Sequence, residues 1–90
     1  MRTITLEKRI GALGTDMNVK ILVNGQIVDE LFEGEMKKIV KLYEGSQVVV
    51  AKVFDEDNKE YASNAFFVTG SKDANAFIDL NGMRVTIKER

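Results

Sequence analysis

Two Asn-Gly dipeptides, Asn24-Gly25 and Asn81-Gly82, constrain the fold of this chain more than any other feature. Both residues of Asn-Gly tolerate positive φ, which a type I′ turn requires, so the dipeptide is the strongest short-range signal for a β-hairpin. Each dipeptide lies between two runs in which apolar and polar residues alternate, as in strands with one buried face. The sequence therefore predicts hairpins over residues 17–32 and 75–88.

A two-residue loop fixes how the two strands of a hairpin pair. Counting outward from the first turn gives these pairs: Val23 with Gln26, Leu22 with Ile27, Ile21 with Val28, Lys20 with Asp29, Val19 with Glu30, Asn18 with Leu31 and Met17 with Phe32. Counting from the second turn, with Asn81 and Gly82 at positive φ, gives these: Leu80 with Met83, Asp79 with Arg84, Ile78 with Val85, Phe77 with Thr86, Ala76 with Ile87 and Asn75 with Lys88. Both hairpins thus have an apolar face and a face with one pair of opposite charges.

Other strands are predicted from alternation and from β-branched residues. Residues 3–6 form a first strand with Ile4 and Leu6 inward, and residues 7–9 after it are charged and predicted to be solvated. Residues 47–54 form the strongest single strand, because four valines suit a pleated sheet. Residues 61–69 form another strand. Residues 36–43 fit two patterns, a strand with Lys38, Val40 and Leu42 on one face, or a short helix.

The fold class follows from turn signals that recur along most of the chain at the spacing of a small antiparallel all-β sandwich or barrel. We predict a single domain over residues 1–90, an immunoglobulin-like β-sandwich of about 7–8 short strands. The alternative is an α+β fold with a short helix at 35–44. The predicted core contains Ile4, Val19, Ile21, Val48, Val50, Phe67, Ile78, Val85 and Ile87.

Composition excludes several classes of function. The chain has no Cys, hence no disulfide or thiol chemistry, and no His, the commonest general base and metal ligand. Its net charge is -1 with both signs mixed along the chain, so a basic footprint for nucleic acid or for an anionic membrane surface is lacking. No apolar run is long enough to span a membrane or to form a signal peptide, which slightly favours the cytoplasm. We expect neither a cofactor nor enzymatic activity.

One acidic loop offers oxygen ligands for Ca²⁺. The residues concerned are Asp55, Asp57, Asn58 and Glu60. A full EF-hand loop needs Gly at its sixth position and Glu at its twelfth, whereas counting from Asp55 gives Glu60 and Phe66 there. We therefore predict a solvated acidic turn with at most millimolar Ca²⁺ affinity.

Two further groups of residues concern contacts with other proteins. Tyr43, Tyr61 and Phe66 are candidates for an aromatic partner surface, because adjacent Phe66 and Phe67 must point to opposite faces of a strand. The lysines of residues 37–41 indicate an edge strand protected by charge. Self-association through edge strands is a further expectation.

Residues 19–53 resemble small immunoglobulin-like accessory domains of the PEGA kind. The resemblance is carried by Val23-Asn24-Gly25-Gln26, then Glu44-Gly45 and the apolar Val48-Val49-Val50. The chain departs from that group in having no Pro. The resemblance implies a β-sandwich with a binding or spacer role. The expected function is a non-enzymatic protein-interaction or assembly module, and the alternative is a structural subunit of a phage or mobile-element assembly.

Overall fold

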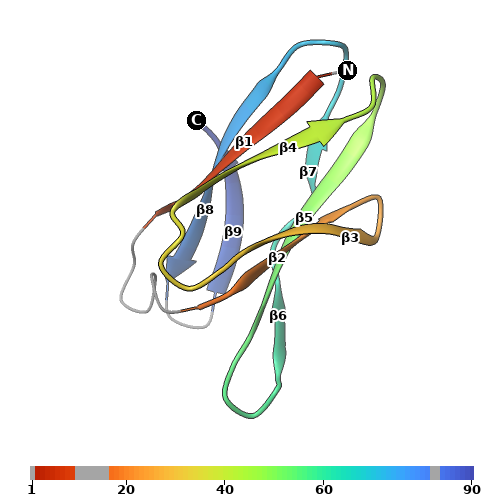
Figure 1. Cartoon of the computed structure of the whole chain (residues 1–90). Coiled ribbons are helices and arrows are strands. Elements are labelled where there is room, and N and C mark those ends of the chain that lie inside the picture. Colours follow the sequence, from red (N-terminus) through yellow and green to blue (C-terminus); the bar gives the residue numbers. More distant parts are fainter. Residues whose placement is uncertain (1, 10–16, 82–83) are drawn as a thin grey trace.

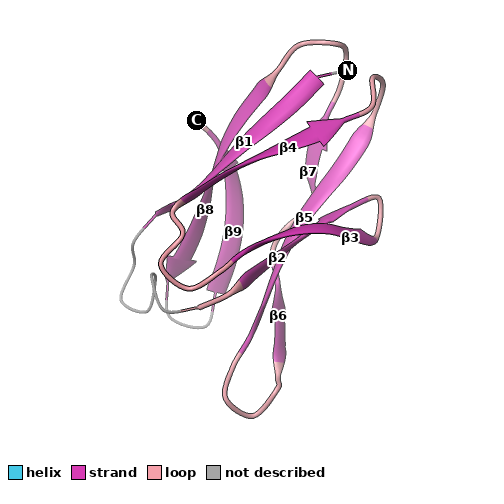
Figure 2. Ribbon diagram, in the orientation of Figure 1, coloured by secondary structure: helices cyan, strands magenta, loops and turns pink. Residues whose placement is uncertain are grey.

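The computed structural model describes residues 2–9, 17–81 and 84–90, and these residues form an all-β fold (Figures 1 and 2). The strands are β1 (Arg2–Arg9), β2 (Val19–Val23), β3 (Gln26–Leu31), β4 (Lys37–Leu42), β5 (Gln47–Phe54), β6 (Glu60–Ala62), β7 (Phe66–Val68), β8 (Ala74–Asn81) and β9 (Arg84–Glu89). The described part of the chain contains no helix that could cross a membrane.

The strands form two sheets that enclose one core, which confirms the predicted β-sandwich. The four-stranded sheet has the order β4-β1-β8-β9, and the five-stranded sheet has the order β3-β2-β5-β6, with β7 also pairing with β5. The strands β1 and β8 are parallel, and the other pairs are antiparallel. In Figure 1, β1 and β8 lie side by side although they come from the two ends of the chain.

Strand β1 is longer than predicted and carries charged residues on its inward face. Arg2, Ile4, Leu6 and Lys8 alternate as buried residues along it. The prediction that Lys8 is solvated is therefore wrong. Since β1 lies between β4 and β8, every second side chain along its length faces the other sheet.

The first hairpin has the predicted turn but a different register. Asn24 and Gly25 have φ of 51° and 84°, as the prediction requires. The two pairs beside the turn are also as predicted, but the register then shifts between Ile21 and Leu22. Val28 is the extra residue of this β-bulge.

The shift changes the predicted pairs beyond the bulge, so that Ile21 pairs with Asp29, Lys20 with Glu30 and Val19 with Leu31. The predicted pair of Asn18 with Leu31 is therefore also wrong. It places Leu31 instead of Glu30 on the buried face, where Leu31 is fully buried. Burying a leucine side chain contributes roughly 1.5–3 kcal/mol, whereas a glutamate there would be an unpaired charge in the core. This difference gives a physical reason for the bulge.

The second hairpin keeps the predicted faces, but its pairing is shifted by two residues. Asn81 ends β8 and pairs with Arg84, so it does not take the predicted turn position. Farther from the turn, Ile78 pairs with Ile87. A shift by two preserves which side chains point inward. The predicted φ of Gly82 and the pairing of Met83 lie outside the described residues.

Residues 36–43 contain the strand β4, so the alternative with a helix at 35–44 is wrong. Val40 and Leu42 are buried, and Lys37, Ile39 and Lys41 face outward. Strand β4 is an edge of its sheet, as its lysines predict. The strand pattern prevails because β1 offers a full row of backbone partners to these residues.

The predicted strand over residues 61–69 is broken into β6 and β7. Asn64, in the interruption, turns away from the strand, and its side-chain amide accepts from the Ile87 N–H (2.8 Å) and donates to the Ile87 carbonyl (3.1 Å). The break reverses the alternation, so Phe66 packs against the core and Phe67 is 68% exposed. The assignment of Phe67 to the core is therefore wrong.

The central strand β5 also corrects the predicted core. Val49, Ala51 and Val53 are buried, whereas Val48 and Val50 are only half-buried on the outer face. A strand that is apolar on both faces gives no signal for which face is covered, and the described residues form no third layer over the outer face. The remaining predicted core residues, Ile4, Val19, Ile21, Ile78, Val85 and Ile87, are buried as expected.

Candidate functional site

The outer face of the five-stranded sheet carries a continuous apolar surface. Leu22 pairs with Ile27 on one side and with Val50 on the other, and directly paired residues of antiparallel strands point to the same face. Val48 lies two residues from Val50 on that face and pairs with Phe67. We call these five residues, Leu22, Ile27, Val48, Val50 and Phe67, the apolar face.

Exposure within the apolar face is greatest at its two sides. Ile27 on β3 is 61% exposed and Phe67 on β7 is 68% exposed, whereas Leu22 between them is buried by its neighbours. The next row along the strands is charged, since Lys20 pairs with Glu30 and with Lys52. The face therefore has an apolar centre with charges of both signs at its border, which is the usual composition of a contact surface.

The outer face of the four-stranded sheet is organised differently. Its aromatic residue, Phe77, lies between two guanidinium groups, with Arg9 at 4.6 Å and Arg90 at 5.3 Å from the ring centroid. Arg90 also pairs with Glu7 at 2.6 Å, and Arg9 pairs with Asp79 at 3.6 Å. This ion-pair network leaves Phe77 partly buried, while Phe67 on the opposite side of the molecule has no comparable cover in the described residues.

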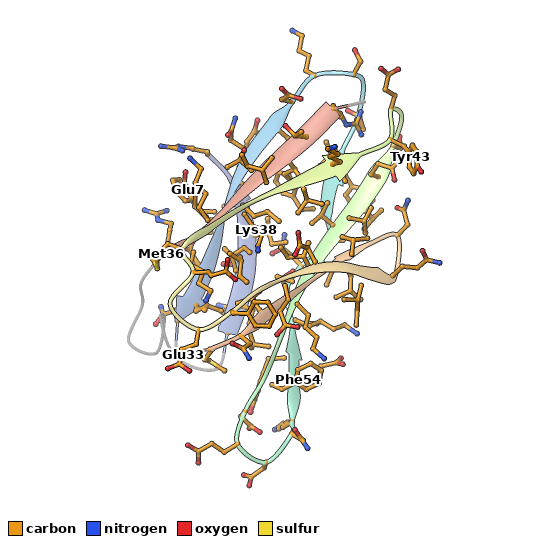
Figure 3. All side chains as sticks on the ribbon, viewed as in Figure 1. Glu7, Glu33, Met36, Lys38, Tyr43 and Phe54 are labelled. Atoms are coloured by element: carbon orange, nitrogen blue, oxygen red, sulfur yellow. The ribbon has the colours of Figure 1, made fainter. Side chains whose placement is uncertain are left out.

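The three aromatic residues predicted as a partner surface occupy different environments. Tyr43 is 72% exposed and projects just beyond β4 (Figure 3). Tyr61 and Phe66 are partly buried against the core. Of the adjacent Phe66 and Phe67, Phe67 is the exposed residue, because the break between β6 and β7 reverses the alternation of the strand. Sequence reasoning assigned Phe67 to the core, and it placed Ile27 on the more polar face of the first hairpin without assigning it to a contact surface.

The candidate Ca²⁺ loop is organised by a single carboxylate. Asp55 accepts hydrogen bonds from the backbone N–H groups of Asp57 (2.9 Å) and Lys59 (2.8 Å) and from the Tyr61 hydroxyl (3.1 Å). The Lys59 N–H, followed by the Tyr61 hydroxyl and the Asp57 N–H, lowers the pKa of Asp55 below its usual value of 3.8. Burial and the nearby Asp55 raise the pKa of Tyr61.

These bonds give Asp55 a structural role in the turn. Asn58 supports the same turn with a φ of 63°. Within the described ranges, no three acidic side chains gather in a way that could hold a metal ion. The Asp55, Asp57, Asn58 and Glu60 set thus forms a hydrogen-bonded connection between β5 and β6.

Two buried cations, Arg2 and Lys8, lie near the two ends of β1. The Nη2 of Arg2 donates to the Gly45 and Val68 carbonyls, and Lys8 Nζ donates to the Met17 (2.9 Å) and Phe32 (3.0 Å) carbonyls. Within the described residues, Nε and Nη1 of Arg2 lack hydrogen-bond partners. Burial lowers the pKa of Lys8, while Glu35 and Glu33 act in the opposite direction. The signal that could have found both cations is the alternation itself, which runs on from Ile4 and Leu6 in both directions.

A hollow beside β7 and β8 is the nearest approach to a small-molecule site. Its lining includes Phe66, Lys72, Asp73 and Arg90. Two of its polar groups already have partners, because Asp73 accepts from the Thr3 N–H at 2.8 Å and Arg90 pairs with Glu7. This arrangement offers no paired nucleophile and base among the described residues.

Comparison of the chain with protein-family models, with curated proteins and with solved structures found no match.

Proposed function

We propose that this chain is a small non-enzymatic β-sandwich that acts as a protein-interaction or assembly module and binds its protein partner through the apolar face. The observation that carries the proposal is the contrast between the two outer faces. One holds its aromatic residue under two arginines, and the other leaves Phe67 and Ile27 more than half exposed beside half-buried valines.

The chemistry of the apolar face defines the kind of partner. Its five residues carry no charge, so the partner must present an apolar patch of its own. Fully burying a side chain the size of Ile27 or Phe67 contributes roughly 1.5–3 kcal/mol, and a few such anchors supply most of the binding energy of many interfaces. Lys20, Lys52 and Glu30 at the border would contribute orientation more than affinity.

A non-enzymatic role is supported by the use of the titratable groups with shifted pKa values. Asp55 organises a turn, and Lys8 binds two backbone carbonyls. The carboxylate of Glu35 accepts from the Phe32 N–H (2.9 Å) and from Lys38 (3.1 Å), and these two bonds lower the pKa of Glu35. Each of these groups is engaged in holding a loop, and the chain has neither His nor Cys.

The immunoglobulin-like character and the resemblance to domains of the PEGA kind belong to the same proposal. Two packed sheets and a hairpin turned at Asn24-Gly25 agree with that resemblance. A structural subunit of a phage or mobile-element assembly is the second candidate, and the unpaired edges of β3 and β4 favour it.

The proposal is tested by affinity capture from source-cell lysate with three forms of the chain. Phe67→Ser removes the most exposed residue of the apolar face. Phe32→Ser is the matched control, because Phe32 is 54% exposed but lies beyond the end of β3. We expect one protein, identified by mass spectrometry, to be retained by wild type and by Phe32→Ser and lost with Phe67→Ser. Equal retention by all three forms would place the contact elsewhere.

A further inference from the structure

The two sheets end at unpaired edges on the same side of the sandwich. Among the strands that the structure describes, β3 pairs only with β2, and β4 pairs only with β1. The chain passes directly from β3 to β4, and Figure 1 shows them as neighbouring strands of different sheets. Lys38 of β4 reaches across this side to Asp29 of β3, with 3.9 Å between Nζ and Oδ1 (Figure 3). Each molecule therefore offers two free strand edges together.

The two edges carry opposite charge. Strand β3, with the sequence QIVDEL, contains two acidic residues and no basic one. Strand β4, with the sequence KKIVKL, contains three lysines and no acidic residue. Two β4 edges would bring lysines against lysines, and two β3 edges would bring carboxylates against carboxylates, whereas β3 and β4 are complementary.

We infer that β3 of one copy of this chain pairs antiparallel with β4 of a second copy, and that the two copies form a symmetric dimer. The chain reverses direction between β3 and β4. A two-fold axis parallel to the strands therefore brings β3 of each copy beside β4 of the other, and both edges are satisfied at once. The lysines of β4 then select the partner edge by charge as well as opposing unspecific pairing.

The β-bulge gives this pairing a definite register. The outward residues of β4 are Lys37, Ile39 and Lys41. On the outward face of β3, Ile27 is followed directly by Glu30, because Val28 is the extra residue of the bulge. Placing Ile39 opposite Ile27 of the second copy sets Lys37 opposite its Glu30. The two isoleucines are 60% and 61% exposed in the single chain, so both gain cover.

Lys37 and Glu30, which are opposed in this register, are both free to form an ion pair between the two copies. The Glu30 carboxylate makes no ion pair within the described residues, and Lys37 makes only a long contact of 3.9 Å with Glu7. The dimer extends each sheet across the two copies and leaves Phe67, on β7 at the far side of its sheet, outside the contact. The dimer shares Ile27 with the apolar face, whereas Glu30 and Lys37 lie outside that face, so variants at these two charged residues test the dimer without altering the apolar face.

A cysteine cross-link tests the register directly, because the chain has no Cys of its own. Directly opposed residues in an antiparallel pair have Cα atoms about 4.5–5.5 Å apart, which a disulfide can span. We expect Ile27→Cys mixed with Ile39→Cys to give a covalent dimer on a non-reducing gel under mild oxidation, with little from either variant alone. Rapid cross-linking of Ile39→Cys with itself, or none in the mixture, would overturn the inference.

Charge reversal tests the same contact in solution by sedimentation at several concentrations. Wild type is expected to reach twice the 10.1 kDa of one chain. Glu30→Lys should weaken the dimer about tenfold, since it reverses two cross-strand pairs, and Glu30→Lys with Lys37→Glu in one chain should restore it. Glu56→Lys, in the exposed connection between β5 and β6, is the control with the same charge change outside the pair. A wild type that stays monomeric at millimolar concentration, assemblies longer than a dimer, or a dimer indifferent to Glu30→Lys would each contradict it.

Discussion

The two sheets of this molecule differ in where their charged and apolar side chains lie. The four-stranded sheet supplies the buried cations, Arg2 and Lys8, and on its outer face a network of ion pairs around Phe77. The five-stranded sheet and its connections supply the carbonyl acceptors for those cations, at Met17, Phe32, Gly45 and Val68. Its outer face carries the uncovered apolar residues.

The difference shows how strands with the same alternation acquire different roles. Inward positions of both sheets contribute apolar side chains to one core, so apart from the two buried cations the sheets differ where they face solvent. An aromatic residue between two arginines gains cation–π contacts and cover from water. An aromatic residue beside valines keeps its exposed surface for another molecule. Variants on the inner and outer faces of the two sheets test this comparison.

Truncating a buried isoleucine should lower the free energy of unfolding by a similar amount in either sheet. Ile21→Ala in the five-stranded sheet and Ile78→Ala in the four-stranded sheet should each lower the free energy of unfolding by about 2–5 kcal/mol, because both side chains are fully buried. Val50→Ala, on the half-buried outer face of β5, is the control and should cost clearly less. Urea denaturation measures all three, and a core variant that unfolds at the wild-type midpoint would contradict the core assignment.

Removing the buried ammonium should break the link between the sheets near the start of β2. Lys8→Met keeps most of the packing but leaves the Met17 and Phe32 carbonyls without their donor, so we expect a loss of about 1–3 kcal/mol at neutral pH. Urea denaturation near neutral pH measures the loss, and no loss would show that Lys8 contributes only its carbon chain.

The pH dependence of Lys8 has a definite sign. Burial lowers the pKa of Lys8 in the folded chain below its usual value of 10.5. Between these two pKa values the unfolded chain binds more protons, so the contribution of Lys8 to stability rises with pH over that window. The free energy of unfolding of wild type minus that of Lys8→Met should therefore increase as the pH is raised toward 10.5. A constant difference would contradict a shifted pKa.

Removing the arginines over Phe77 should give the four-stranded sheet an exposed aromatic residue, comparable to Phe67 on the five-stranded sheet. Arg9→Ser combined with Arg90→Ser removes both guanidinium groups from the ring and should cost about 1–2 kcal/mol at most, since exposed cation–π contacts contribute about 0.5–1 kcal/mol each. Binding of a hydrophobic dye at neutral pH should rise relative to wild type. Lys41→Ser, on the outer side of β4 with Thr3 as its cross-strand neighbour, should leave dye binding unchanged.

The smallest effect on stability is expected at the apolar face. Phe67→Ser should change the free energy of unfolding by less than about 1 kcal/mol, because the side chain is mostly exposed and contacts its cross-strand neighbour Val48. Hydrophobic dye binding should fall. A loss comparable to that of Ile21→Ala would show that Phe67 belongs to the core after all.

Local patterns predicted a large part of this fold. The alternation in the last hairpin identified the buried positions of β8 and β9, although the pairing is shifted by two residues. The lysines of β4 identified an edge strand. Of the two most exposed residues of the apolar face, Ile27 was placed correctly opposite Leu22, whereas Phe67 was assigned to the core. Phe67 depends on the break at Asn64, which is made by a contact with Ile87 more than twenty residues away.

Local sequence patterns were sufficient for the all-β class, for the turn at Asn24-Gly25 and for the inward residues of strands in which apolar and polar residues alternate, because φ preferences and the period of two act between near neighbours. The other features depend on contacts between distant segments. The bulge at Val28 exists because Leu31 fits the core better than Glu30, and the fully apolar stretch of β5 has an outer face because the described residues form no third layer over it. Lys8 and Arg2 are buried because carbonyls from distant loops meet them there.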